Sequence, residues 1–185
     1  KRGFSTLRFN FRGVGRSQGT YSRGEGELTD AAAALDWLQT LKPDAKNVWV
    51  AGFSFGAWIG MQLLMRRPEI GGFISVSPPA NMYDFSFLAP CPSSGLIIHG
   101  DADEIVPQEA VLRLVDKLSL QKGIVIDYEN IEGAGHVFMK DLEMMLGRVA
   151  VYVDRRLEDE ALLLAPPEEE AEEAEGDADE ASTAK

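Results

Sequence analysis

The chain has 185 residues, enough for one domain with a substantial buried core. Its formal net charge is −12, but residues 158–185 hold twelve acidic residues and one lysine, so residues 1–157 carry only about −1. A nearly neutral body lacks a basic surface for nucleic acid, and no apolar run reaches the roughly 18 residues that cross a bilayer. We therefore expect neither nucleic acid nor a membrane as a partner, and the oligomeric state stays open.

A single cysteine, Cys91, excludes an internal disulfide, which is typical of a reducing compartment such as the cytoplasm. Cys91 lies between two prolines in an expected loop, where we interpret it as an inert thiol. The chain has two histidines and no Cys/His cluster, so the sequence predicts no metal site. No cofactor is expected.

Short apolar segments alternate with amphipathic segments along the chain. The sequence predicts strands over residues 3–11, 47–53, 71–77, 96–99 and 124–131, and helices over residues 27–41, 55–67, 107–120 and 138–157. This alternation is typical of an α/β fold with a mostly parallel sheet covered by helices on both faces. Residues 1–157 are expected to form this domain, and residues 158–185 an acidic disordered tail.

The pentapeptide from Gly52 to Gly56 matches the pattern G-x-S-x-G, with Ser54 at its centre. The string alone is weak evidence, but it follows an apolar strand and opens a predicted helix. A sharp turn there lifts the serine clear of the sheet, and the helix N-terminus offers N–H groups to a developing negative charge. The alternative is a glycine-rich junction at which Ser54 only caps the helix. We interpret Ser54 as a nucleophile.

A serine hydroxyl needs a base, and the base in turn needs an acid. His136 follows a glycine-rich loop after the last predicted strand, where it can reach over the sheet edge, whereas His99 ends a buried strand and is expected to be structural. Three acids, Asp101, Asp103 and Glu104, follow the fourth predicted strand. The residues themselves do not choose among these acids.

Three segments, in this order, resemble the α/β-hydrolase superfamily. They are Gly52-x-Ser54-x-Gly56, His99-Gly-x-x-Asp103-x-x-Val-Pro107 and Gly133-Ala-Gly-His136. The resemblance covers residues 1 to about 157 and is closest to small bacterial members similar to dienelactone hydrolases and to carboxylesterases or thioesterases. It implies that Asp103 is the acid of a Ser54–His136–Asp103 triad and that the backbone N–H of Phe55 is one oxyanion-hole donor.

Several side chains near these positions are candidates for contact with a substrate. We expect Phe11, Phe53 and Val106 to line the substrate pocket. The aromatic residues of a loop over residues 80–94, including Tyr83 and Phe85, either cap the site or pack the loop against the body.

The resemblance also implies earlier strands that have no counterpart downstream of Lys1. In the family's strand order, one of them lies between the strand predicted over residues 3–11 and the strand predicted over residues 47–53, and its following loop holds the second oxyanion donor. We therefore expect the chain to be a piece of a longer protein.

The favoured function is a serine hydrolase that cleaves an ester or thioester of a small-molecule acyl substrate through an acyl-enzyme. Peptides, lipids and lactones remain open as substrates, as does acyl transfer in place of hydrolysis. The alternative is a non-catalytic scaffold or binding module of the same fold, whose acidic tail recruits a basic partner.

Overall fold

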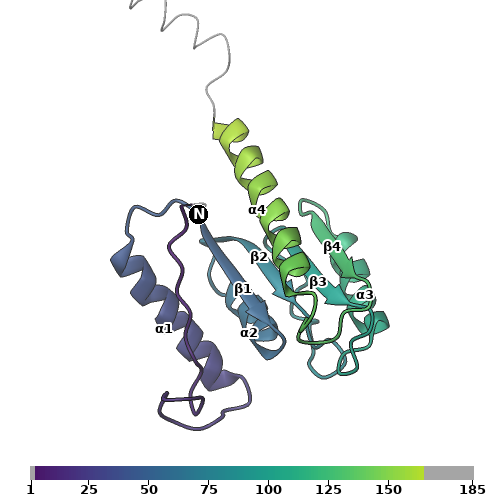
Figure 1. The fold of residues 1–185 in the computed structure, drawn as a ribbon. Coiled ribbons are helices and arrows are strands. Elements are labelled where there is room, and N and C mark those ends of the chain that lie inside the picture. The colour runs from purple at the N-terminus through teal and green to yellow at the C-terminus, as the bar shows by residue number, and fades with distance from the viewer. Residues whose placement is uncertain (1–2, 165–185) are drawn as a thin grey trace, which may run out of the picture. The chain divides into compact units, whose positions relative to one another are not determined.

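The structure is a computed structural model that describes residues 3–164, with side chains described as far as residue 159. The described residues divide into two units, with the boundary between Leu146 and Gly147. The elements in chain order are α1 (Glu25–Leu41), β1 (Val48–Phe53), α2 (Phe55–Leu64), β2 (Ile70–Val76), β3 (Gly95–Gly100), α3 (Gln108–Ser119), β4 (Ile126–Ile131) and α4 (Leu142–Leu164) (Figure 1). Within residues 3–164, no helix combines the length and apolar character of a membrane span.

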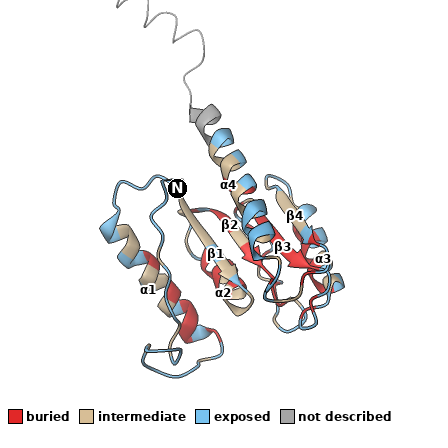
Figure 2. Cartoon of the chain, viewed as in Figure 1, coloured by how far each residue is buried: buried red, intermediate tan, exposed pale blue. Residues whose placement is uncertain are grey.

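The four strands form one parallel sheet in the order β1-β2-β3-β4, so each strand lies beside the next one along the chain (Figure 1). The carboxyl ends of all four strands consequently meet at one edge of the sheet. Every residue of β3 is buried, which requires cover on both faces of that strand (Figure 2). The predicted parallel α/β architecture is confirmed.

Helices α2 and α3 each connect one strand to its parallel neighbour. α2 packs on β1 and β2, α3 packs on β3 and β4, and α1 packs on α2. Because parallel crossovers are right-handed, α2 and α3 cover the same face of the sheet. A single hydrophobic core follows from this arrangement, and it includes Ile59 and Leu63 of α2, Phe73 of β2, and Val111 and Leu118 of α3.

Residues 3–11 do not form the predicted strand. They run as irregular chain, and Phe4 and Phe9 are 45% and 42% exposed. The alternating pattern is a property of the segment itself, but a strand also needs a neighbour that completes its ladder of hydrogen bonds. The family's strand order puts another strand between residues 3–11 and β1, and within the described sheet β1 pairs with β2 alone, so the strand that would pair with residues 3–11 is not among the described ones.

The last helix is displaced along the chain from its prediction. It begins at Leu142 rather than at Phe138 and ends at Leu164 rather than at Leu157. Residues 158–164 are therefore helical, not part of a disordered tail, and leucine, alanine and glutamate in this stretch favour helix continuation. The remainder of the predicted tail, residues 165–185, lies outside the described residues.

Helix α1 begins with a buried carboxylate. Glu27 is 1% exposed and accepts hydrogen bonds from the backbone N–H groups of Ser22 and Gly24, both at 2.8 Å. Burial raises the pKa of Glu27, but the backbone N–H bonds outweigh it and hold the pKa below its ordinary value. The ionised carboxylate thus fixes the turn that leads into α1.

We expect Glu27→Gln to lower the free energy of unfolding at pH 7 by about 1–3 kcal/mol, because an amide places an NH₂ against one of the two N–H donors. Urea unfolding measures this loss. The folded-state pKa is depressed, so the carboxylate's contribution is present above the unfolded pKa and is lost as the pH falls through the folded one. The difference between the two proteins should therefore shrink in acid.

Glu25→Gln is the matched control, because Glu25 lies in the same first turn of α1 but is exposed. It should change stability by less than about 0.5 kcal/mol. Equal losses from the two substitutions would contradict the role assigned to Glu27.

Candidate active site

Ser54 occupies the turn between β1 and α2. Its backbone has φ 51° and ψ −119°, a positive-φ conformation that costs a non-glycine residue about 1–3 kcal/mol. The Ser54 N–H donates to the carbonyl of Val76 at 2.8 Å, which ties the turn to the end of β2. The serine therefore projects from a strained turn that the neighbouring strand holds in place.

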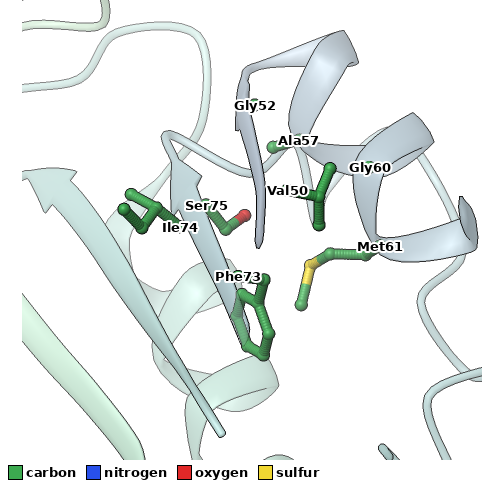
Figure 3. A pocket seen from close by; sticks show the side chains of 8 residues that line it. All are labelled: Val50, Gly52, Ala57, Gly60, Met61, Phe73, Ile74 and Ser75. Carbon is green, nitrogen blue, oxygen red and sulfur yellow. The ribbon is translucent and has the colours of Figure 1, made fainter. Parts of the chain in front are cut away.

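Glycine at position 52 allows this turn to close. A Cβ on Gly52 would overlap the backbone of Gly56 and Ala57, and a Cβ on Gly60 would come within 3.0 Å of Val50. Figure 3 shows Ala57 and Gly60 of α2 beside Gly52 and Val50 of β1. The crevice between them leaves no room for a water molecule. α2 can thus begin directly beneath the serine.

The structure brings together the three residues predicted to form the triad. His136 Nε2 lies 3.0 Å from Ser54 Oγ, and His136 Nδ1 lies 2.7 Å from Asp103 Oδ2. These residues follow β1, β3 and β4, so the shared sheet edge places them side by side. A serine, an imidazole and a carboxylate in this chain of contacts can move a proton away from the hydroxyl.

Asp103 is held as a carboxylate. Its Oδ1 accepts the backbone N–H groups of Ile105 and Val106, both at 2.8 Å, and its Oδ2 faces His136. Burial raises the pKa of Asp103, but the hydrogen bonds from Val106, His136 and Ile105 together place it below the ordinary value. Asp103 is consequently ionised at neutral pH and orients the imidazole with Nδ1 as the donor.

Two further residues support the His136 loop: Ser77, which sequence reasoning did not consider, and Asp101, one of the three acids left open there. Ser77, completely buried at the end of β2, donates from Oγ to the carbonyl of His136 at 3.3 Å. Asp101 Oδ1 accepts the N–H of Gly133 at 2.7 Å, so this acid positions the loop rather than the imidazole. The signal that could have found them was local: Asp101 directly follows β3, and Ser77 directly follows β2.

The other histidine, His99, is completely buried beside the same carboxylate. Its Nε2 lies 3.0 Å from the carbonyl of Val106, which only accepts, so Nε2 carries the proton. Nδ1 then carries no proton, and it has no hydrogen-bond partner among the described residues. It lies 3.8 Å from Asp103 Oδ2. Burial lowers the pKa of His99, which keeps the ring neutral. His99 therefore holds the turn that carries Asp103 without competing for Oδ2.

The predicted substrate-contacting residues lie in three different environments. Phe53 is 44% exposed, and its ring centroid is 5.1 Å from that of His136. Phe11 is half-buried and contacts Phe55, the residue after Ser54, at 5.6 Å between ring centroids. Val106 is completely buried, and its backbone bonds to Asp103 and His99. The structure thus gives Val106 a supporting place and does not support a substrate contact for its side chain.

The aromatic residues of the loop after β2 pack this loop against the body of the domain. Phe85 is buried in the core cluster and stacks on Phe87 at 6.0 Å between centroids. Tyr83 stacks on Trp58 at 4.3 Å and lies 5.8 Å from the Phe55 ring. Of the two open interpretations, the structure favours packing for Phe85 and leaves Tyr83 beside the site.

Among the described residues, no group of three or more His, Cys, Asp or Glu side chains is placed to hold a metal ion. The polar groups that converge on Ser54 form a relay of proton donors and acceptors. A parallel α/β sheet that presents a serine, a histidine and an aspartate at its carboxyl edge has the architecture of a serine hydrolase.

Comparison with known proteins agrees with this class. The family model for X-Pro dipeptidyl-peptidase (S15 family) matches residues 1–91. A structure of a candidate α/β hydrolase of unknown function from Agrobacterium tumefaciens is 61% identical with a TM-score of 0.84, over 90% of this chain and 75% of that chain. An α/β serine hydrolase without a lid from Xanthomonas campestris is 35% identical with a TM-score of 0.73, over 86% and 67%. The chain belongs to the α/β-hydrolase family.

An uncharacterized protein of Rickettsia prowazekii is 57% identical over 140 residues. The match covers 74% of this chain and 59% of that protein, so the chain spans less than two thirds of the curated relative's length.

The two glycines of the turn should respond differently to alanine. We expect Gly52→Ala to lower the free energy of unfolding by about 3 kcal/mol, because the added Cβ meets backbone that has no rotamer to change. Gly56→Ala should change it by less than about 0.5 kcal/mol, since a Cβ there meets nothing within 4 Å. Thermal and urea unfolding measure both. A larger loss at Gly56 than at Gly52 would show that the turn is packed differently.

For His99, the Gln and Leu variants separate the hydrogen bond from the packing. We expect His99→Leu to slow labelling of Ser54 by a fluorophosphonate about tenfold or more, because it leaves the carbonyl of Val106 unpaired and loosens the Asp103 turn. Glutamine carries an N–H donor at the reach of Nε2 and should recover most of the rate. Equal rates for the Leu and Gln variants would argue against the hydrogen bond as the cause.

Proposed function

We propose that the chain is the catalytic part of a serine hydrolase that cleaves an ester or thioester of a small acyl substrate. The observation that carries this proposal is the continuous contact from Ser54 Oγ to His136 Nε2 at 3.0 Å, and from His136 Nδ1 to Asp103 Oδ2 at 2.7 Å. A carboxylate, an imidazole and a hydroxyl in this order make a serine nucleophilic.

In the proposed mechanism, Ser54 Oγ attacks the substrate carbonyl carbon while His136 Nε2 takes its proton. The C–O or C–S bond to the leaving group breaks as the resulting imidazolium returns that proton to the leaving oxygen or sulfur, and an acyl-Ser54 ester remains. Water then attacks the ester, with His136 again as base, and releases a carboxylic acid and free Ser54. Asp103 stabilises the imidazolium in both halves.

The oxyanion needs donors close to the nucleophile. Phe55 is the first residue of α2, so its N–H has no carbonyl one turn earlier in the helix to bond to and lies at the positive end of the helix dipole. One such donor is worth about 10²–10³ in rate. The resemblance to the family implies that the second donor comes from the loop after an earlier strand.

Apolar side chains beside the site favour an apolar acyl or alcohol group. Phe53, Ile105 and Val137 are 44%, 51% and 54% exposed, and they lie within two residues of Ser54, Asp103 and His136 in sequence. Burial of such groups against a substrate is favourable by about 25 cal/mol per Å². The S15 family model, whose description is of a peptidase, ends before Asp103 and His136, so it does not favour an amide over an ester.

Labelling with a fluorophosphonate tests the proposal. We expect labelling of the chain to be lost in Ser54→Ala and to fall by about 10⁴ in His136→Ala, since the base no longer activates the hydroxyl. Ser86→Ala, at an exposed serine of the loop after β2, is the control and should label like the parent.

A second protein distinguishes an unactivated Ser54 from a site that lacks its N-terminal part. It carries the N-terminal region of the Agrobacterium relative in front of Lys1. Faster Ser54-dependent labelling in this version, together with turnover of an activated ester, is the expected result. Absence of labelling in both versions would refute the hydrolase proposal and leave the scaffold hypothesis in its place.

A further inference from the structure

A groove of about 780 Å³ lies between α3 and the loop after β2, away from the residues of the proposed triad. Its volume falls within the range of small-molecule sites in proteins. One wall is a single face of α3, because Ala110, Leu114 and Leu118 recur at intervals of four residues. From Ala110 to Leu120 this wall is about 15 Å long.

The other wall is a loop that is fixed in position by side-chain hydrogen bonds. Gln121 donates to the carbonyl of Leu88 at 2.8 Å and accepts the N–H of Cys91 at 2.6 Å. Trp58 Nε1 donates to the carbonyl of Asp84 at 3.0 Å. Leu88 itself is 2% exposed and lines the groove. The groove is thus formed before any ligand arrives, and its floor is apolar.

The charged residues of the groove are mostly cations. Arg113 and Lys117 lie one helical turn apart on α3, and Lys122 follows the end of the helix. Among the described residues that line the groove, the one carboxylate is Asp84, which accepts the N–H of Ser86 at 2.8 Å and its hydroxyl at 2.6 Å. Hydrogen bonds from Ser86, and to a smaller extent the nearby charge of Lys117, lower the pKa of Asp84, so this carboxylate is ionised and offsets part of the positive charge of the groove. Three cations above an apolar floor stand out in a body of nearly neutral charge.

We propose that this groove is a second binding site, for a medium-chain carboxylate. The carboxylate lies between Arg113 and Lys117, and the unbranched chain runs along the floor formed by Leu88, Leu114 and Leu118. A planar guanidinium pairs well with a carboxylate, and the methylene chain gains from burial on side chains that are already desolvated. A ligand with a neutral headgroup gains only the apolar contact with the floor, and one with a cationic headgroup is repelled by Arg113 and Lys117.

The site is distinct from the proposed catalytic one and does not depend on it. Its lining contains none of Ser54, Asp103 and His136, and Tyr83, which lines the groove, also contacts Phe55. The binding test therefore uses the Ser54→Ala protein, in which the proposed chemistry is absent.

Decanoate is the probe, titrated calorimetrically and followed by the indole N–H resonance of Trp58, whose partner Asp84 belongs to the groove wall. We expect saturable binding of one decanoate per chain and a shift of that resonance. Arg113→Gln combined with Lys117→Gln should raise the Kd about tenfold, because two charge pairs are lost. Lys42→Gln combined with Lys46→Gln removes two exposed lysines outside the groove and should leave the Kd unchanged.

Two further experiments test the charge of the ligand's headgroup and the apolar contact with its chain. Decanol should bind about tenfold more weakly than decanoate, and decyltrimethylammonium weaker still. Leu120→Gln, at a groove residue that is 85% exposed and hence free to change without unfolding, should weaken decanoate binding. Absence of saturable binding, a Kd unchanged in the Arg113/Lys117 variant, or equal binding of decanoate and decyltrimethylammonium would each overturn the proposal.

Discussion

The site depends on one constraint, the common direction of four neighbouring strands. Ser54 and His136 are 82 residues apart, and Asp103 and His136 are 33 residues apart. Each follows a different strand, and the parallel register places the ends of β1, β3 and β4 at one edge. The entropic cost of bringing these distant residues together is therefore offset by the folding of the whole domain. The three side chains then need only short loops to touch.

A second layer of contacts restricts those loops. Ser77, at the end of β2, fixes the backbone of His136, Asp101 fixes the loop before it, and His99 fixes the turn that presents Asp103. All three lie at or just beyond the strand ends. Groups that are already oriented need little reorganisation when charge develops, and this is where an enzyme gains most of its electrostatic advantage. The sheet therefore positions both the reacting groups and their supports.

Much of this arrangement could be predicted from the sequence because its signals are local. Apolar runs that alternate with amphipathic segments predicted the four strands. The serine motif at a strand–helix junction predicted that Ser54 occupies a sharp turn. The strand over residues 3–11 was wrong because pairing depends on a neighbour, which no local pattern reveals. The burial of Val106 in the core and the groove along α3 were beyond prediction, since both depend on tertiary contacts between segments that are distant in the sequence. The position of Asp101 after β3 was visible in the sequence, but its contact with Gly133, 32 residues away, was not.

β1, the strand that leads to Ser54, is also a terminal strand of the described sheet, and Ala51 and Phe53 near its end are exposed. A terminal strand of this kind presents backbone donors and acceptors in the geometry of a sheet, and a second strand of any origin can add to it. One of the two terminal strands of the described sheet is thus the one that leads to Ser54. A strand that pairs along this edge would therefore also fix the position of the turn that presents Ser54.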